Sequence, residues 1–228
     1  MNPDYERAKN SLKHVYWVGG AAAAGKTTIC RRLCDRYGFI RWSGDARWIE
    51  HWHSATPESH PIPHRIGSTM RDGGSLEWFF GRPARNIADD YVTMARAEFQ
   101  SAVDELTQMP RDTPIVVDAF LGFPELILKV AHPENAVFLI CTEEFMQRTW
   151  TLRTSESAPG FLPILKRQLD TCTDPRSALD LFNESNKIQS RFIADDCRRE
   201  SARLIVTGGR IDADEVYDAV RKHFRLTE

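Results

Sequence analysis

The chain has 228 residues, of which 42% are hydrophobic and 27% are charged, and its formal net charge is -2 at pH 7. This length suits a single α/β domain over residues 1–228 with one insertion better than two independent domains. The near-neutral charge argues against bulk affinity for nucleic acid or an anionic membrane, because both need a positive field. The apolar runs are far shorter than the roughly 20 residues of a membrane span, and the N-terminus lacks the apolar core of a signal peptide. We therefore expect a cytoplasmic protein.

The first part of the chain predicts a strand, a helix and a second strand. After a polar lead, residues 14–18 read HVYWV, which is typical of a buried strand. A helix is expected over residues 26–36 and a short strand over residues 39–42. This order is that of a βαβ unit.

The segment over residues 52–85 is rich in proline and glycine. These residues are expected to interrupt every candidate helix or strand, so we interpret the segment as an insertion that caps the substrate site. A long helix follows over residues 85–106, where apolar residues recur every three or four positions.

The second half predicts three more strands and four helices. The strands are expected at residues 114–118, 136–140 and 204–206, and the helices at 124–130, 143–153, 177–199 and 212–224. Thr142 can cap the helix that starts beside it. Five strands that alternate with helices predict a three-layer α/β fold with a mainly parallel sheet.

The cysteines are odd in number and widely spaced, which gives no disulfide or zinc framework. We interpret them as small buried residues. They are Cys30, Cys34, Cys141, Cys172 and Cys197.

A phosphate-binding motif lies between the first strand and its helix. Residues 20–27 read GAAAAGKT and fit the P-loop pattern G-x-x-x-x-G-K-[ST]. Gly20 and Gly25 let backbone N–H groups turn toward a polyphosphate, and the positive end of the helix points at the same place. Lys26 is expected to pair with the β- and γ-phosphates of ATP. The alternative is an ordinary strand-to-helix turn rich in alanine and glycine.

Other residues of the motif complete the expected nucleotide site. Thr27 is expected to ligate Mg²⁺ through its hydroxyl, and Thr28 to make a lesser contact with the α-phosphate. The alanines have side chains small enough for phosphate to approach closely; they are Ala21, Ala22, Ala23 and Ala24.

Two aspartates follow strands at the edge that faces the P-loop. Asp118 ends an apolar strand, as a Walker-B carboxylate that holds Mg²⁺ does, although it could simply be a turn residue. Asp45 follows the second strand and is the candidate that accepts the proton of an acceptor hydroxyl. Its alternative role is to cap a helix through Glu50.

Basic residues flank a break near residues 154–160 and predict a lid over about residues 148–170. Arg148 and Arg153 are the candidates that contact the transferred phosphate, with Lys166 and Arg167 on the far side. Each could instead be a solvated surface charge. Gly209, after the last strand, is the candidate residue of the pocket for the nucleotide base.

The P-loop, the Asp45 turn and the run VVDAFLG at residues 116–122 together resemble the nucleoside-kinase-like P-loop superfamily. Among its members the chain is similar to chloramphenicol phosphotransferase-like enzymes and to uncharacterised bacterial kinase-like P-loop proteins. This resemblance implies a five-stranded core, which we expect in the order 2-3-1-4-5, ATP with Mg²⁺ as cofactors, and Asp45 as the catalytic base.

The insertion holds histidines and aromatic residues with two possible roles each. The histidines could in principle bind zinc, but their spacing and the lack of a nearby cysteine favour surface or acceptor-contacting roles. They are His51, His53, His60 and His64. The aromatic side chains either line an acceptor pocket or pack beneath the cap. They are Trp42, Trp48, Trp52, Trp78, Phe79 and Phe80.

The sequence thus predicts an ATP- and Mg²⁺-dependent phosphotransferase that acts on a hydroxyl of a small molecule, as a monomer or homodimer. A regulatory NTPase and a nucleic-acid end kinase are the alternatives. The stretch Asn186-Lys187-Ile188-Gln189 lacks the aspartate of a guanine-reading motif, which favours ATP over GTP. A nucleic-acid groove would need more basic charge.

Overall fold

The computed structural model describes residues 3–53, 55–119, 122–153, 162–208 and 212–227. Its sheet has five strands, all parallel, in the predicted order β2-β3-β1-β4-β5. The strands are β1 (Val15–Gly20), β2 (Ile40–Ser43), β3 (Ile115–Asp118), β4 (Ala136–Cys141) and β5 (Arg203–Thr207). The predicted α/β fold class is therefore confirmed.

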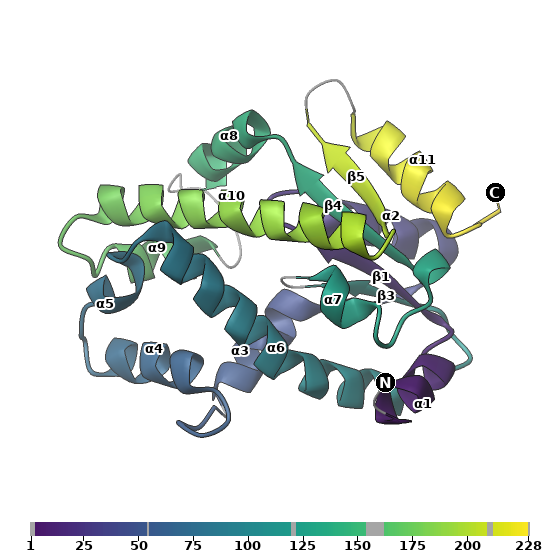
Figure 1. Ribbon diagram of the computed structural model, residues 1–228, viewed down its shortest axis with the longest axis horizontal. Helices are drawn as coiled ribbons and strands as arrows, with labels where there is room; N and C mark the ends of the chain where they lie inside the picture. The colour runs from purple at the N-terminus through teal and green to yellow at the C-terminus, as the bar shows by residue number, and fades with distance from the viewer. Residues whose placement is uncertain (1–2, 54, 120–121, 154–161, 209–211, 228) are drawn as a thin grey trace.

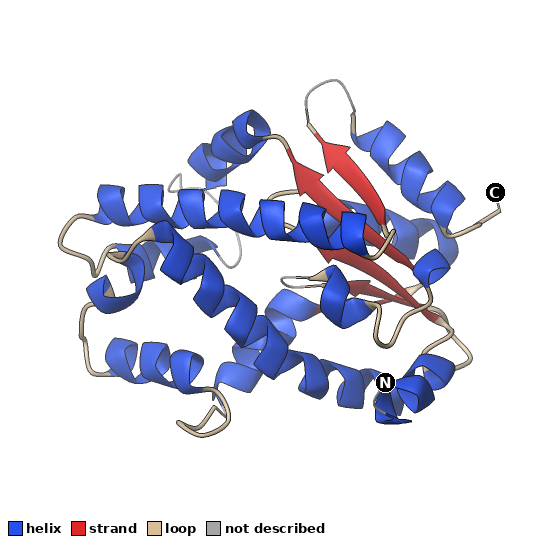
Figure 2. Ribbon diagram, in the orientation of Figure 1, coloured by secondary structure: helices blue, strands red, loops and turns tan. Residues whose placement is uncertain are grey.

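Helices cover both faces of the sheet and make three layers (Figures 1 and 2). Helices α2 and α11 pack on one face, while α6, α7 and α10 lie on the other, with α10 crossing α6. The helices of the N-terminal half are α1 (Pro3–Ser11), α2 (Lys26–Tyr37), α3 (Gly44–His53), α4 (Pro61–Arg71), α5 (Glu77–Phe80) and α6 (Ala84–Gln108). Those of the C-terminal half are α7 (Pro124–Ile127), η1 (Pro133–Asn135), α8 (Glu143–Arg153), α9 (Leu162–Leu169), α10 (Pro175–Arg199) and α11 (Ala213–His223).

The central strands are apolar on both faces because helices cover both sides of them. Every residue of β3 is buried, and β1 and β4 have one half-buried residue each. Continuous apolar runs are typical of parallel strands in such a position.

The predicted helix cap is also present, since the Phe145 amide donates to the Thr142 hydroxyl at 3.3 Å.

Four helices differ from the sequence expectation, and two of them, α4 and α5, lie inside the segment that we expected to be interrupted. Helix α4 forms across Pro61, Pro63 and Gly67, where we expected every element to be interrupted. That expectation was wrong because both prolines lie in the first turn, whose N–H groups need no partner inside the helix. Helix α1 forms in the polar lead, which has no strong apolar period, and the eight-residue helix α9 follows the predicted break after α8.

All five cysteines are free thiols, and four of them are buried. Burial raises the pKa of the Cys30 thiol well above its ordinary value.

Within the ranges given above, no helix is both long and apolar enough to cross a membrane.

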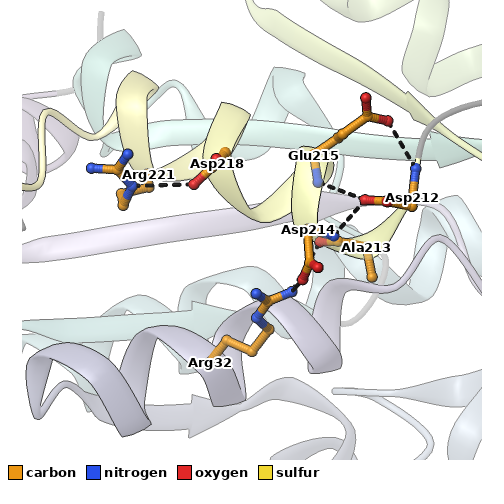
Figure 3. A network of polar contacts seen from close by, with 7 residues as sticks. All are labelled: Arg32, Asp212, Ala213, Asp214, Glu215, Asp218 and Arg221. Atoms are coloured by element: carbon orange, nitrogen blue, oxygen red, sulfur yellow. Dashed lines mark hydrogen bonds and ion pairs between the residues drawn. The ribbon is translucent and has the colours of Figure 1, made fainter.

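The last helix is fixed to the P-loop helix by a polar network (Figure 3). The Asp212 side chain accepts hydrogen bonds from the amides of Asp214 and Glu215, and the Glu215 carboxylate accepts one from the Asp212 amide, which is a capping box. Arg32 of α2 donates to the Ala213 carbonyl at 3.1 Å and forms an ion pair with Asp214 at 2.8 Å. The start of α11 is therefore held both by its own cap and by α2.

Asp212→Ala should lower the free energy of unfolding by about 1 kcal/mol, because two amides of the first turn lose their acceptor. Urea unfolding followed by circular dichroism measures this change. The matched control is Asp218→Ala on the exposed side of the same helix. The Oδ1 atom of Asp218 lies 3.4 Å from the Nε atom of Arg221. That control should cost less than about 0.5 kcal/mol, and equal losses in the two variants would contradict the capping role.

Candidate functional site

The turn between β1 and α2 has the backbone shape of a phosphate-binding loop. Gly20 and Gly25 have φ angles of 117° and 87°, in the region that glycine adopts readily, and Ala23 also has a positive φ of 63°. Gly25 is the N-cap residue of α2 and has no side chain to cap the helix. The positive end of α2 is thus open to an anion, and the alanines of the loop place only methyl groups around it.

Hydrogen bonds hold the first residues of the loop against neighbouring segments. The Gly20 amide donates to the Gly122 carbonyl at 2.9 Å, and the Ala21 amide donates to the Leu139 carbonyl at 2.8 Å. The ammonium group of Lys26 donates to the Gly20 and Ala21 carbonyls at 3.1 and 2.6 Å. The Lys26 side chain therefore folds back over the loop, where it is predicted to bind phosphate.

A threonine at the end of β5 also supports the loop. The Thr207 hydroxyl is buried and donates to the Ala24 carbonyl at 3.2 Å. Gly208 follows with a φ of 86°, and a Cβ there would lie 2.7 Å from the Phe145 Cβ. Sequence reasoning missed this contact, since it joins residues that lie far apart in the chain. Gly209, the predicted base-pocket residue, lies outside the described residues.

Asp118 lies at the end of β3, between the two neighbouring strands. The register pairs it with Val18 of β1 and with Ser43 of β2. Its side chain is only 4% exposed, and Arg41 of β2 donates to its Oδ2 at 2.6 Å. Sequence reasoning missed Arg41, although a charged residue inside an apolar strand could have suggested a buried partner.

Asp45 lies in the first turn of α3, two residues after Ser43. Because Ser43 and Asp118 are paired, the register brings both aspartates to the same edge of the sheet. The side chain of Asp45 is exposed. Helix α3 begins at Gly44, so Asp45 lies within the helix, near its positive end, rather than before it as an N-cap residue does.

Thr27 and Asp118 are the predicted Mg²⁺ ligands. Thr27 lies half-buried in the first turn of α2, and Thr28 beside it is exposed. Hydroxyl and carboxylate oxygens are the donors that Mg²⁺ prefers, so these two side chains fit that cation. The ion pair with Arg41 involves Oδ2 of Asp118.

The predicted lid lies partly outside the described residues. Arg148 is exposed on α8, with its guanidinium carbon 5.5 Å from the centre of the Phe145 ring. Arg153 ends α8, but its side chain is outside the described part, as are residues 154–161. On α9, Lys166 forms an ion pair with Asp170 at 2.7 Å. Phosphate contacts from Arg148 and Arg153 stay predictions.

The predicted insertion brings two histidines to one carboxylate. Glu98 of α6 contacts the Nδ1 atom of His51, and His60 lies 3.6 Å from its other oxygen. Burial raises the pKa of Glu98, and the hydrogen bond with His51 opposes that shift. Among the residues that the structure describes, no group of histidine, cysteine or acidic side chains is arranged to hold a metal ion. His51 and His60 thus both approach Glu98, and an acceptor-contacting role for them stays a prediction.

The aromatic residues of the insertion fall into two groups. Trp42 and Trp48 line a cavity beneath α6. Phe79 and Phe80 are buried in the core, where they pack edge-on against each other with ring centres 4.9 Å apart. Phe79 and Phe80 thus pack beneath the cap, while the acceptor-pocket role of Trp42 and Trp48 stays a prediction.

The strand order and the loop after β1 together decide the fold. The chain has the P-loop NTPase fold. It matches no protein-family model and no curated protein. Solved structures that are similar to it include a shikimate kinase from Acinetobacter baumannii in complex with shikimate, with 19% identity, a TM-score of 0.38, and coverage of 93% of this chain and 90% of that one. Another is a gluconokinase from Sinorhizobium meliloti, with 18% identity, a TM-score of 0.31, and coverage of 81% and 95%.

Gly122→Ala should distort the P-loop, because a Cβ there would lie 2.5 Å from Gly19 Cα and 3.1 Å from the Gly20 amide nitrogen. We expect a loss of about 1–3 kcal/mol in stability. ATP affinity should fall at least about tenfold, which corresponds to 1.4 kcal/mol of binding free energy. Thermal unfolding and a titration with a fluorescent ATP analogue measure the two effects.

The matched control is Gly67→Ala in α4, where the added methyl meets only the tip of the Arg71 side chain, at 3.3 Å. It should raise stability by about 0.5–1 kcal/mol, since alanine suits a helix better than glycine. Its ATP affinity should stay unchanged. Unaltered ATP binding in Gly122→Ala would show that the loop does not depend on this close approach.

Proposed function

We propose that the protein is an ATP- and Mg²⁺-dependent phosphotransferase that moves the γ-phosphoryl group to a hydroxyl of a small molecule. The observation that carries this proposal is the arrangement at one edge of the sheet. There, Lys26 lies over the P-loop, Asp118 ends β3, and Asp45 follows the adjacent strand β2. A phosphate-binding loop beside two carboxylates supports phosphoryl transfer more specifically than nucleotide binding alone.

The donor half of the site would bind ATP through the loop. Backbone N–H groups of residues 20–27 and the ammonium of Lys26 would surround the phosphates. Thr27 and Asp118 would hold Mg²⁺, which neutralises charge that develops on the transferred group. Arg41 would keep Asp118 in place through Oδ2. Arg148 and Arg153 would add positive charge from the lid.

The acceptor half would use Asp45 as a general base. The acceptor oxygen attacks the γ-phosphorus, the bond from that phosphorus to the β–γ bridging oxygen breaks, and ADP leaves. The proton of the acceptor hydroxyl passes to the Asp45 carboxylate. The position of Asp45, two residues beyond the strand residue paired with Asp118, supports this role.

The same proposal includes the setting in which the enzyme works. A small-molecule acceptor fits a chain with a net charge of -2, which offers little attraction for nucleic acid. We propose a cytoplasmic monomer or homodimer.

Asp45→Asn should lower kcat by about 100- to 10,000-fold, because a positioned general base contributes that much to proton transfer. ATP affinity should change little, since Asp45 does not belong to the loop. Lys26→Ala should instead lose both ATP affinity and turnover. Product formation with ATP, Mg²⁺ and a panel of alcohols, followed by mass spectrometry, measures transfer, and isothermal titration measures ATP binding.

The matched control for Asp45→Asn is Asp35→Asn, which removes a carboxylate from the far part of α2. It should retain full activity. Full phosphoryl transfer in Asp45→Asn would exclude the role of a base. ATP hydrolysis without transfer to any acceptor would favour the regulatory NTPase.

A further inference from the structure

A small cavity lies between the sheet and α6, outside the P-loop. Its volume is about 50 Å³, and aromatic side chains make much of its wall. Trp17 and Trp42 come from the strands, Trp48 from α3 and Phe99 from α6. The described residues that line it include one ionisable side chain, that of Glu98.

Among the residues of the lining, Glu98 and Trp17 each carry a polar atom that has no hydrogen-bond partner among the described residues. They are the Oε2 atom of Glu98 and the indole nitrogen of Trp17, and both are buried. The side chain of Glu98 is 12% exposed. His51 contacts its Oε1 atom, while His60, at 3.6 Å from Oε2, is too far for a hydrogen bond. A buried carboxylate oxygen without a donor has a high cost, which a ligand with an N–H or O–H group would relieve.

The cavity reaches the edge of the sheet where phosphoryl transfer is proposed. Gly44, which precedes Asp45, and Ala119, which follows Asp118, belong to its lining. The cavity thus reaches the backbone beside both aspartates of the proposed site, although neither aspartate side chain belongs to its lining. His51 approaches one oxygen of Glu98 and His60 the other, so α3, the residue that caps α4, and α6 all meet at this carboxylate.

The electrostatics of the lining favour a cation. A buried carboxylate pairs best with a positive group, and the faces of tryptophan rings attract cations as well. A volume of about 50 Å³ is too small for an aromatic ring, since a cavity that takes benzene measures about 150 Å³. It suits a short alkyl group with one polar terminus.

We propose that this cavity binds a short alkyl arm of the phosphoryl acceptor that ends in an ammonium group, which pairs with Glu98. The acceptor is then an amino alcohol, and its hydroxyl lies toward Asp45. The identity of the bound molecule as the acceptor rests on the proposed phosphotransferase function. The binding of an ammonium group does not.

The binding test uses ethylammonium chloride as the probe and ethanol as its neutral match, with sodium chloride at equal ionic strength. Saturation-transfer NMR on the wild-type chain should show ethylammonium binding at least about tenfold tighter than ethanol. Glu98→Gln should remove that preference. Asp104→Asn, which alters an exposed carboxylate on the same helix, should keep it. Equal binding of the two probes by the wild-type chain, or an unchanged preference in Glu98→Gln, would overturn the proposal.

A second variant covers the case in which Glu98→Gln does not fold. Ala95→Val adds two methyl groups to the wall of the cavity without changing any charge. It should abolish ethylammonium binding and leave ATP binding intact. Full ethylammonium binding in this variant would also overturn the proposal, because the probe would then lie elsewhere.

The acceptor test compares 3-aminopropan-1-ol with butan-1-ol in the ATP-dependent assay. The amino alcohol should have a kcat/KM at least about tenfold higher, and the ratio should fall toward one in Glu98→Gln. If phosphoryl groups were transferred to neutral alcohols but not to amino alcohols, the assignment of the acceptor as an amino alcohol would be overturned. The proposed phosphotransferase function would still stand. Ethylammonium binding with transfer to neither class would count against the phosphotransferase and leave the cavity as an ammonium site.

Discussion

The geometry of the P-loop depends on a contact between two stretches of backbone that leaves no room for side chains. A Cβ on Gly122 would lie 2.5 Å from Gly19 Cα, and one on Gly20 would lie 1.9 Å from the Leu139 carbonyl oxygen. This contact allows the hydrogen bonds that tie the start of the loop to the segment after β3 and to β4. Because the loop is tied at its start, the positive end of α2, Lys26 and Asp118 all lie at one edge of the sheet.

The features that could be predicted are those encoded within a few neighbouring residues. The apolar runs predicted the strands, and the spacing of glycine and lysine predicted the loop. Thr142 predicted a helix cap that the structure contains. Asp118 could be placed because a carboxylate at the end of an apolar strand is a local pattern. Its partner could not be placed, since Arg41 lies 77 residues away in the chain and meets Asp118 only once β2 and β3 pair.

The cap segment shows where a local rule failed. Proline and glycine suggested irregular backbone, yet α4 forms because Pro61 and Pro63 fall in its first turn. Apolar side chains of the cap segment also join the core, with Ile66 of α4 and Phe79 of α5 in the same buried cluster as the sheet. Packing against α6 therefore supplies the stability that helix propensity lacks, and single-sequence reasoning does not see that packing.

The pairing of Arg41 with Asp118 also bears on how this edge could accept ATP. Two carboxylates near a phosphate site repel a polyphosphate, and the repulsion grows as the surroundings become less polar. Arg41 offsets the charge of the buried Asp118, so that Lys26 and the positive end of α2 act on the phosphates with less opposition. If Mg²⁺ then binds near Asp118, it adds to a carboxylate already held in place by Oδ2. The salt bridge thus links the stability of the sheet to the electrostatics of the proposed donor site.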